Sequence, residues 1–211
     1  MTVTASAATL DERCAGVAKF EGAITDAKVR LEAALERDQQ FRKQTQRSNT
    51  FTTEQPPSPA ARQQLLRDQQ KLDLENLKLL DSIVCKFGWP GIDVVGQRAS
   101  LAAFLIVQHA ELAVQETYLP TLQKAATSKQ AEPSQVATLE DRINVRNQRP
   151  QRYASQLCFL KRGGYAWRPI ENEDEAAIDA AREMVGLGTI QSYAAYFKVE
   201  YVPPSKRPCD N

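Results

Sequence analysis

The residues of this chain that are best suited to chemistry lie around its single histidine. His109 directly follows an apolar run in the segment FLIVQHAEL, and it is the only histidine among 211 residues. At about 100° per residue, a helix places His109 beside Leu105 and Ala113, so we expect packed surroundings. A buried imidazole costs free energy unless a partner satisfies it. His109 is therefore either a hydrogen-bonded core residue or the general acid, general base or ligand-binding group of a functional site.

Other polar side chains occupy positions where apolar ones would cost less to bury. Each has an ordinary structural explanation; Asp38 and Arg42, one helical turn apart, could form an exposed ion pair worth roughly a few tenths of a kcal/mol. If they act together, Asp38 or Asp73 would orient His109, and Arg142 would hold a carboxylate or phosphate. The residues expected to line such a cleft are Asp38, Arg42, Asp73, Asn76, Gln108, His109, Arg142, Tyr153 and Gln156.

The reaction expected of this cleft is hydrolysis or group transfer on a small polar molecule or a peptide. The sequence contains no GxSxG nucleophile motif, no glycine-rich phosphate loop and no HExxH or paired-cysteine zinc motif. We therefore expect no cofactor and no metal, although carboxylates leave a Mg²⁺ or Ca²⁺ site open, without EF-hand spacing to support it.

Two other classes of function remain open. In the first, the protein binds one protein partner, as an immunity or adaptor protein does, and the polar residues form a structural network. In the second, the protein binds a small ligand without catalysis. A pocket of binding-site volume beside His109 favours an enzyme or a ligand-binding module, whereas a closed, packed His109 favours an interaction protein.

Helices must position most of these residues, because apolar side chains recur at three- and four-residue spacing. The pattern predicts helices over about residues 10–46, 60–86, 97–118, 120–128, 134–145, 172–184 and 189–197. Two runs of β-forming residues flank Arg162-Gly163-Gly164 and predict a hairpin near residues 152–168.

The expected fold is mainly α, a single helical domain of five to seven helices with one small β-hairpin near 152–168. This domain spans residues 9–200, and its prolines and polar residues predict a loop at 47–59. We expect a disordered N-terminus at residues 1–8 and a flexible, proline-rich tail at 201–211.

Composition narrows the range of partners. The formal net charge is +1, with 42% hydrophobic and 25% charged residues, as in ordinary soluble globular proteins. This balance provides no general attraction to nucleic acid, and no apolar run approaches the ~20 residues that span a bilayer. We expect a small polar molecule or one protein as the partner, with no nucleic acid and no membrane span. The oligomeric state is left open.

The cysteines and the N-terminus bear on the compartment. The start, MTVTASAATLDER, lacks the basic and apolar regions of a signal peptide. The chain as it stands is expected in the cytoplasm, and in the periplasm or outside the cell if a leader was removed. Cys14, Cys85, Cys158 and Cys209 show no metal-ligand spacing. We expect four reduced thiols; the alternative is two disulfides, for which three pairings exist.

The order of the polar motifs resembles that of a widespread bacterial family of unknown function, over roughly residues 31–197. Members of that family carry DQxxR, DxxN, GWP, QHAD, DR, YGTQ and RxxxGL in this order. The matching residues are Asp38-Gln39 with Arg42, Asp73 with Asn76, Gly88-Trp89-Pro90, Gln108-His109, Asp141-Arg142, Tyr153 with Gln156, and Arg182 with Gly186-Leu187.

This chain departs from the family pattern at two places. Glu111 stands where QHAD has aspartate, and Ala154-Ser155 replace the Gly-Thr of YGTQ. The first change keeps the charge on a longer side chain. The second removes a glycine, which alters any tight backbone turn there. The resemblance implies no established activity, but it implies that the polar positions occur together and share one cleft.

Overall fold

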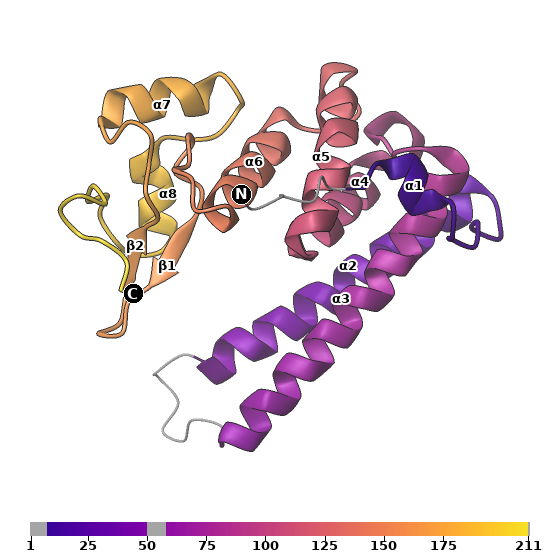
Figure 1. Ribbon diagram of the computed structural model, residues 1–211, viewed down its shortest axis with the longest axis horizontal. Coiled ribbons are helices and arrows are strands. Elements are labelled where there is room, and N and C mark those ends of the chain that lie inside the picture. The colour runs from indigo at the N-terminus through magenta and orange to yellow at the C-terminus, as the bar shows by residue number, and fades with distance from the viewer. Residues whose placement is uncertain (1–7, 50–57, 211) are drawn as a thin grey trace, which may run out of the picture. The chain divides into compact units, whose positions relative to one another are not determined.

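The computed structural model describes residues 8–49 and 58–210, and these residues form eight helices and one antiparallel pair of strands (Figure 1). The prediction of a mainly α protein with one small hairpin is confirmed. The described helices number eight rather than five to seven, because the helix predicted over residues 10–46 is two helices, α1 (Leu10–Cys14) and α2 (Ile24–Asn49). Gly22, between them, has a φ of 124°, which a residue with a side chain rarely adopts.

The chain divides into two compact units, Met1–Tyr118 and Leu119–Asn211, and each is described by itself. The expectation of a single helical domain stays a prediction. The expected disordered N-terminus at 1–8 lies, apart from Ala8, outside the described residues. Of the loop expected at 47–59, residues 47–49 belong to α2, residues 50–57 lie outside the described part, and Ser58 caps the next helix.

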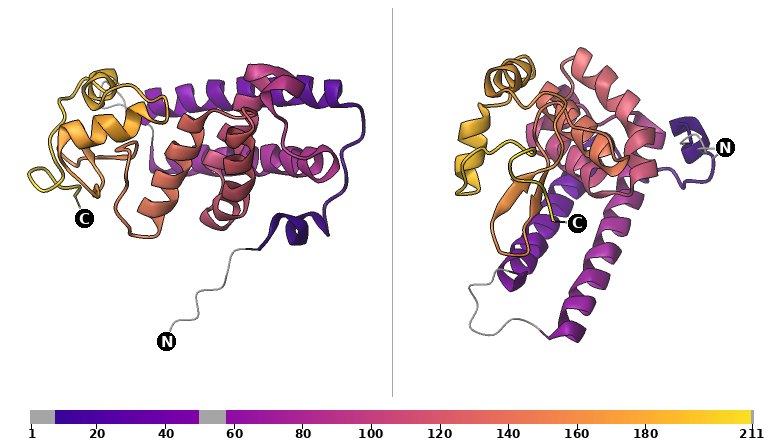
Figure 2. Two further views of the ribbon diagram at one scale, coloured as in Figure 1. Left: turned by 90° about the horizontal axis from the view of Figure 1, so that it is seen from above. Right: turned by 60° about the vertical axis from the view of Figure 1, so that its left-hand side comes forward.

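The first unit is built on two long helices that run side by side in opposite directions, α2 and α3 (Pro59–Phe87) (Figures 1 and 2). Helix α4 (Ile92–His109) contacts both and buries most of its apolar side chains, whereas Val94 and Leu101 stay exposed. The centre of this core consists of fully buried side chains from the three helices. They are Ala27, Leu31 and Ala34 of α2, Leu80 and Ile83 of α3, and Ala99, Ala103 and Val107 of α4.

The end of α4 differs from the sequence-based prediction, which carried this helix to Tyr118 and began the next one at residue 120. Instead α4 ends at His109, and α5 (Leu112–Thr127) contains Pro120 in its interior. The backbone of Ala110 is extended, with φ −70° and ψ 172°, so the chain turns directly after His109. This turn places the imidazole at the end of a helix rather than in the middle of one.

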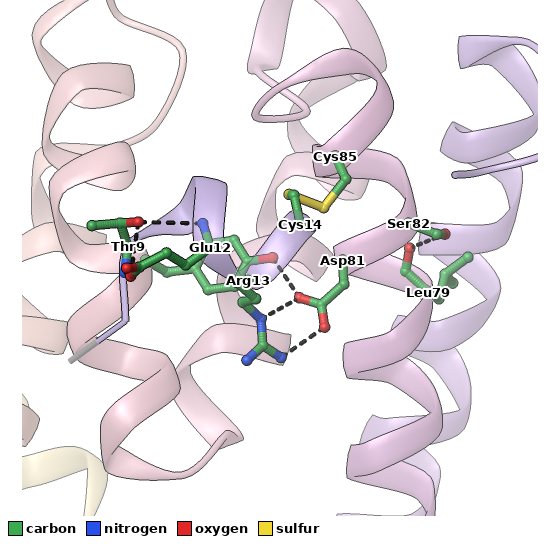
Figure 3. The surroundings of a disulfide bond; sticks show 9 residues. Thr9, Glu12, Arg13, Cys14, Leu79, Asp81, Ser82 and Cys85 are labelled. Atoms are coloured by element: carbon green, nitrogen blue, oxygen red, sulfur yellow. Dashed lines mark hydrogen bonds and ion pairs between the residues drawn. A yellow bond between two sulfur atoms is a disulfide. The ribbon is translucent and has the colours of Figure 1, made fainter. Parts of the chain in front are cut away.

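A disulfide ties the N-terminal helix of the first unit to α3. Cys14 of α1 is bonded to Cys85 of α3 (Figure 3). Asp81 lies one helical turn before Cys85, and its carboxylate accepts two hydrogen bonds from Arg13. The hydroxyl of Tyr118 donates a third hydrogen bond to Asp81, at 2.6 Å. Burial and the neighbouring carboxylate raise the pKa of Tyr118 far above its ordinary value.

The second unit contains the rest of α5, helix α6 (Pro133–Arg146), the hairpin, α7 (Glu175–Glu183) and α8 (Ile190–Tyr196). Strands β1 (Leu157–Phe159) and β2 (Tyr165–Trp167) pair in the predicted place, although both are shorter than expected. Their inner face packs on a cluster of buried residues from the hairpin region and the last two helices. The cluster consists of Ala154, Trp167, Ile170, Ile178, Ile190 and Ala194.

The C-terminal segment is held to the second unit. Cys209 is bonded to Cys158 of β1, Tyr201 donates a hydrogen bond to the backbone oxygen of Glu173, and the hydroxyl and backbone N–H of Ser205 donate to its carboxylate. The tail expected to be flexible at 201–211 is therefore anchored over its described residues.

All four cysteines are paired, so the expectation of reduced thiols is wrong. None of the described helices has the length and apolar character needed to cross a membrane.

Candidate functional site

Three helices of the first unit bring four ionisable side chains together. Asp38 and Arg42 come from α2, Asp73 from α3, and His109 from the last position of α4. Arg42 Nε donates to Asp38 Oδ1 at 2.8 Å, and Arg42 Nη2 donates to Asp73 Oδ1 at 2.6 Å. His109 Nδ1 lies 3.5 Å from Asp38 Oδ1. These four side chains are called the charged cluster below.

The side chains of the charged cluster are largely buried. The side chain of Asp38 is 8% exposed, that of His109 17%, and those of Arg42 and Asp73 22% and 23%. The Asp38–Arg42 pair is therefore not the exposed surface pair that the sequence offered as its ordinary explanation. Two carboxylates face one guanidinium, so the cluster carries a net negative charge unless His109 is protonated.

The two carboxylates of the cluster are not equivalent. Burial opposes the ionisation of Asp38, but the hydrogen bonds and charges of His109 and Arg42 outweigh it and lower the pKa of Asp38. Burial raises the pKa of Asp73, with Arg42 and His109 acting in the opposite direction and Asp38 adding to the rise. Asp38 is consequently the more readily ionised of the two carboxyl groups.

A small cavity lies at the charged cluster. Asp38, Asp73, Asn76 and His109 form its polar lining, and apolar residues of α2 and α4 complete it. The space in which the centre of a water-sized sphere fits is about 10 Å³. The cavity therefore holds about one water molecule or one bare ion. Asn76 is only 3% exposed, and its Oδ1 atom has no hydrogen-bond partner within residues 8–49 and 58–210.

A larger, open groove adjoins this cavity. Its volume is about 400 Å³, within the range of small-molecule sites. It runs between α2 and α4 and shares Leu35 and Leu105 with the cavity. Gln39 lines the groove and also donates from Nε2 to Asp38 Oδ2 at 3.0 Å. The basic side chains Lys43 and Arg98 lie along the groove, with Arg98 paired to Glu36. The groove can therefore seat a small polar ligand next to the charged cluster.

One donor atom from each of Asp38, Asp73 and His109 lies within 4.8 Å of the other two. Such spacing allows three side chains to hold one cation. The sequence did not single out these three residues as a possible metal site, because successive members are 35 and 36 residues apart and belong to three different helices. No local spacing motif could have revealed it.

The remaining predicted residue of the first unit has a different environment. Gln108 is 5% exposed and precedes His109, but it does not line the cavity. Its backbone oxygen accepts a hydrogen bond from Gln115 Nε2 at 2.8 Å. Of the six residues predicted in this unit, four thus form the charged cluster, Asn76 lines the same cavity, and Gln108 is buried without lining it.

Arg142, Tyr153 and Gln156 belong to the second unit, where Tyr153 and Gln156 lie on a tightly bonded loop. The carboxylate of Asp141 is fully buried and accepts the backbone N–H groups of Arg152, Tyr153 and Ser155. Asp141, in the Asp-Arg motif of the sequence, therefore shapes this loop. That the loop shares one cleft with the charged cluster stays a prediction.

Two further polar side chains hold the same loop. Gln151 bonds both the N–H and the carbonyl of Gln156, at 2.7 and 2.8 Å. Arg182 Nη1 donates to the backbone oxygen of Tyr153 at 2.7 Å. Burial lowers the pKa of Arg182. The sequence placed Arg182 in a motif but gave no role to Gln151, whose full burial is visible only in the structure.

Comparison with known proteins places the chain in a family. No curated protein and no solved structure is significantly similar to it. The model of a family of unknown function, DUF6624, matches residues 25–202. This range runs from α2 past α8 and contains all nine residues predicted to line the cleft. It covers most of the chain, and the chain therefore belongs to the DUF6624 family of unknown function.

Proposed function

We propose that this protein is an enzyme that catalyses hydrolysis or group transfer on a small polar substrate, with the charged cluster as its reaction centre. The observation that carries this proposal is the meeting of Asp38, Arg42, Asp73 and His109 at a cavity beside a groove of ligand size. Withdrawing two carboxylates and an imidazole from water costs free energy that an apolar core would avoid. Clustered side chains with shifted pKa values in a concave site are typical of reaction centres.

The contacts suggest how the centre would work. Arg42 bonds one oxygen of each carboxylate, so it fixes Asp38 and Asp73 relative to each other. A substrate in the groove between α2 and α4 would lie beside Gln39, which connects the groove to Asp38. The reacting part of the substrate would then face the small cavity, while the rest stays in the open groove.

The test is substrate discovery with matched variants. The purified protein is incubated with a bacterial metabolite extract and, separately, with a peptide mixture, and changes are followed by mass spectrometry. We expect at least one compound to be consumed by the wild type and to survive with His109→Ala or Asp73→Asn. Glu75→Gln is the control, because it neutralises an exposed carboxylate on the same helix, two residues from Asp73.

The outcomes separate the classes of function. Loss of turnover by about a hundredfold or more in the two cluster variants, with Glu75→Gln unchanged, supports an enzyme. A compound that is bound but never converted points to a ligand-binding module. If nothing is converted or bound by the wild type, the charged cluster is a structural network and the enzyme proposal is rejected.

We further propose that the protein works in an oxidising compartment, the periplasm or the cell exterior. Support comes from the pairing of all four cysteines, since disulfides rarely persist in the cytoplasm. Intact mass of the protein isolated from its native cells, with thiol alkylation before and after reduction, tests this. Four alkylated thiols before reduction would contradict it.

A further inference from the structure

We infer that the charged cluster is a binding site for a divalent transition-metal ion, with Asp38, Asp73 and His109 as ligands and Asn76 Oδ1 as a fourth donor. This inference rests on the same cluster as the proposed function and deepens it. A bound ion would supply the activated water that hydrolysis needs. His109 would then be a ligand of the ion, in place of the acid–base role expected from the sequence.

The distances between the donors suit one ion. Carboxylate oxygens and imidazole nitrogens bind such ions at about 2.0–2.2 Å, so neighbouring donors around one ion are about 3.0–3.6 Å apart. The three donor atoms here already lie within 4.8 Å of one another. Binding therefore requires each donor atom to move inward by less than about 1 Å. The cavity that they line has room for about one ion.

The side chain of Asn76 is an independent sign of a missing ligand. Asn76 is 97% buried, and its Oδ1 atom has no hydrogen-bond partner among the described residues. Buried polar atoms are nearly always paired, because an unpaired one costs free energy. Asn76 lines the same cavity as Asp38, Asp73 and His109. A cation there would satisfy this carbonyl oxygen, which is a common ligand type for metal ions.

Arg42 leaves part of each carboxylate available. It bonds Oδ1 of Asp38 and Oδ1 of Asp73, so Oδ2 of each carboxylate lies outside its hydrogen bonds. Asp38 Oδ2 accepts from Gln39, which lies at the edge of the open groove and can turn away. Two carboxylates against one guanidinium leave a negative charge that attracts a cation.

The types of donor select the class of ion. An imidazole nitrogen together with carboxylate and amide oxygens suits Zn²⁺, Mn²⁺ or Fe²⁺, whereas Ca²⁺ and Mg²⁺ prefer sets of oxygen atoms alone. No cysteine can compete, since all four are in disulfides. Ions of this class also accept four to six ligands, so water or substrate can complete the coordination.

The experiment measures binding directly. Untagged protein is used, because His109 is its only histidine and an added histidine tag would bind metal itself. After dialysis against a chelator and then metal-free buffer, the protein is titrated with Mn²⁺ and Zn²⁺ by calorimetry. Substitution with Co²⁺, followed by visible absorption, reports nitrogen ligation. We expect one saturable site per chain for at least one of the ions.

Conservative variants identify the ligands. Asp73→Asn, His109→Gln and Asn76→Leu are each expected to weaken binding by about tenfold or more, and His109→Gln should alter the Co²⁺ spectrum. Glu75→Gln, the exposed neighbour, should bind as the wild type does. Circular dichroism of each metal-free variant shows whether it is folded, and the rise in melting temperature on adding metal provides a second measure of binding.

Two results would overturn the inference. One is the absence of a saturable site in the folded wild type; the other is unchanged affinity in folded Asp73→Asn and His109→Gln. The metal site and the proposed function can fail separately. Metal binding without any turnover supports the site and rejects the enzyme, whereas turnover by a wild type that shows no saturable metal binding keeps the enzyme and rejects the site.

Discussion

Removing the disulfide of the first unit should destabilise that unit by a predictable amount. The double variant Cys14→Ser, Cys85→Ser opens a loop whose ends are 71 residues apart. The entropy that a crosslink removes from the unfolded chain grows with the logarithm of loop length, and this separation corresponds to about 4 kcal/mol at 25 °C. The bidentate bond from Arg13 to Asp81 remains in the variant, so the folded arrangement of α1 should persist at reduced stability.

The second disulfide provides the matched control. Cys158 and Cys209 are 51 residues apart, and the logarithmic dependence makes the expected loss almost equal, again about 4 kcal/mol. Each disulfide lies within one unit, so the two double variants should affect different parts of the chain. Both also join a cysteine inside the family-matched range to one outside it.

Urea unfolding and hydrogen exchange followed by mass spectrometry check this prediction. The unfolding midpoint of each double variant should fall in proportion to the lost free energy. Loss of Cys14–Cys85 should weaken the protection of peptides from α2 and α3, and loss of Cys158–Cys209 that of peptides from the hairpin and α7. A change below about 1 kcal/mol would refute the reasoning from loop entropy. Equal loss of protection throughout the chain would instead show that the units unfold together, as a single domain does.

Two substitutions in the second unit test the loop that holds Tyr153. Asp141→Asn replaces a buried carboxylate that accepts three backbone N–H groups, and we expect a loss of roughly 2–4 kcal/mol in urea unfolding; an unchanged midpoint would contradict this role. Ala154 has a φ of 50°. The substitution Ala154→Gly relieves about 1 kcal/mol of backbone strain, which stabilises the folded state. It also removes a buried methyl group and makes the unfolded chain more flexible, and both of these effects destabilise the folded state. The unfolding free energy should change by less than about 1 kcal/mol, and a stabilisation beyond about 1.5 kcal/mol would show that the packing of the methyl is unimportant.

Local signals in the sequence determined most of the helices. Helix α3 begins as expected, with Ser58 accepting the N–H of Ala61 and Pro59 in the first turn. Its end at Gly88 and the hairpin around Arg162-Gly163-Gly164 are equally local, because each depends on neighbouring residues. The end of α4 is different. One helix was predicted to end at residue 118 and the next to begin at residue 120, yet Pro120 lies inside α5 and the break falls after His109.

The charged cluster was anticipated as a set of residues but not as an arrangement. Asp38, Arg42, Asp73, Asn76 and His109 could be named from their polar character in helical patterns and from the family resemblance. Their distances, the unpaired Oδ1 of Asn76 and the ion-sized cavity depend on how three helices pack. The sequence also left the role of Asp141 open, because the N–H groups that it accepts come from a loop more than ten residues away.

The amino-acid order by itself determined that the protein is mainly helical, where its hairpin lies, and which polar residues are candidates for a site. Only the tertiary structure decided which cysteines pair, where the buried helix ends, and which carboxylates meet the imidazole. The physical reason is how far apart in the sequence the interacting residues lie. Capping, turns and helical periodicity depend on residues within a few positions of one another, whereas a disulfide across 71 residues or a cluster drawn from three helices depends on the packing of the whole unit.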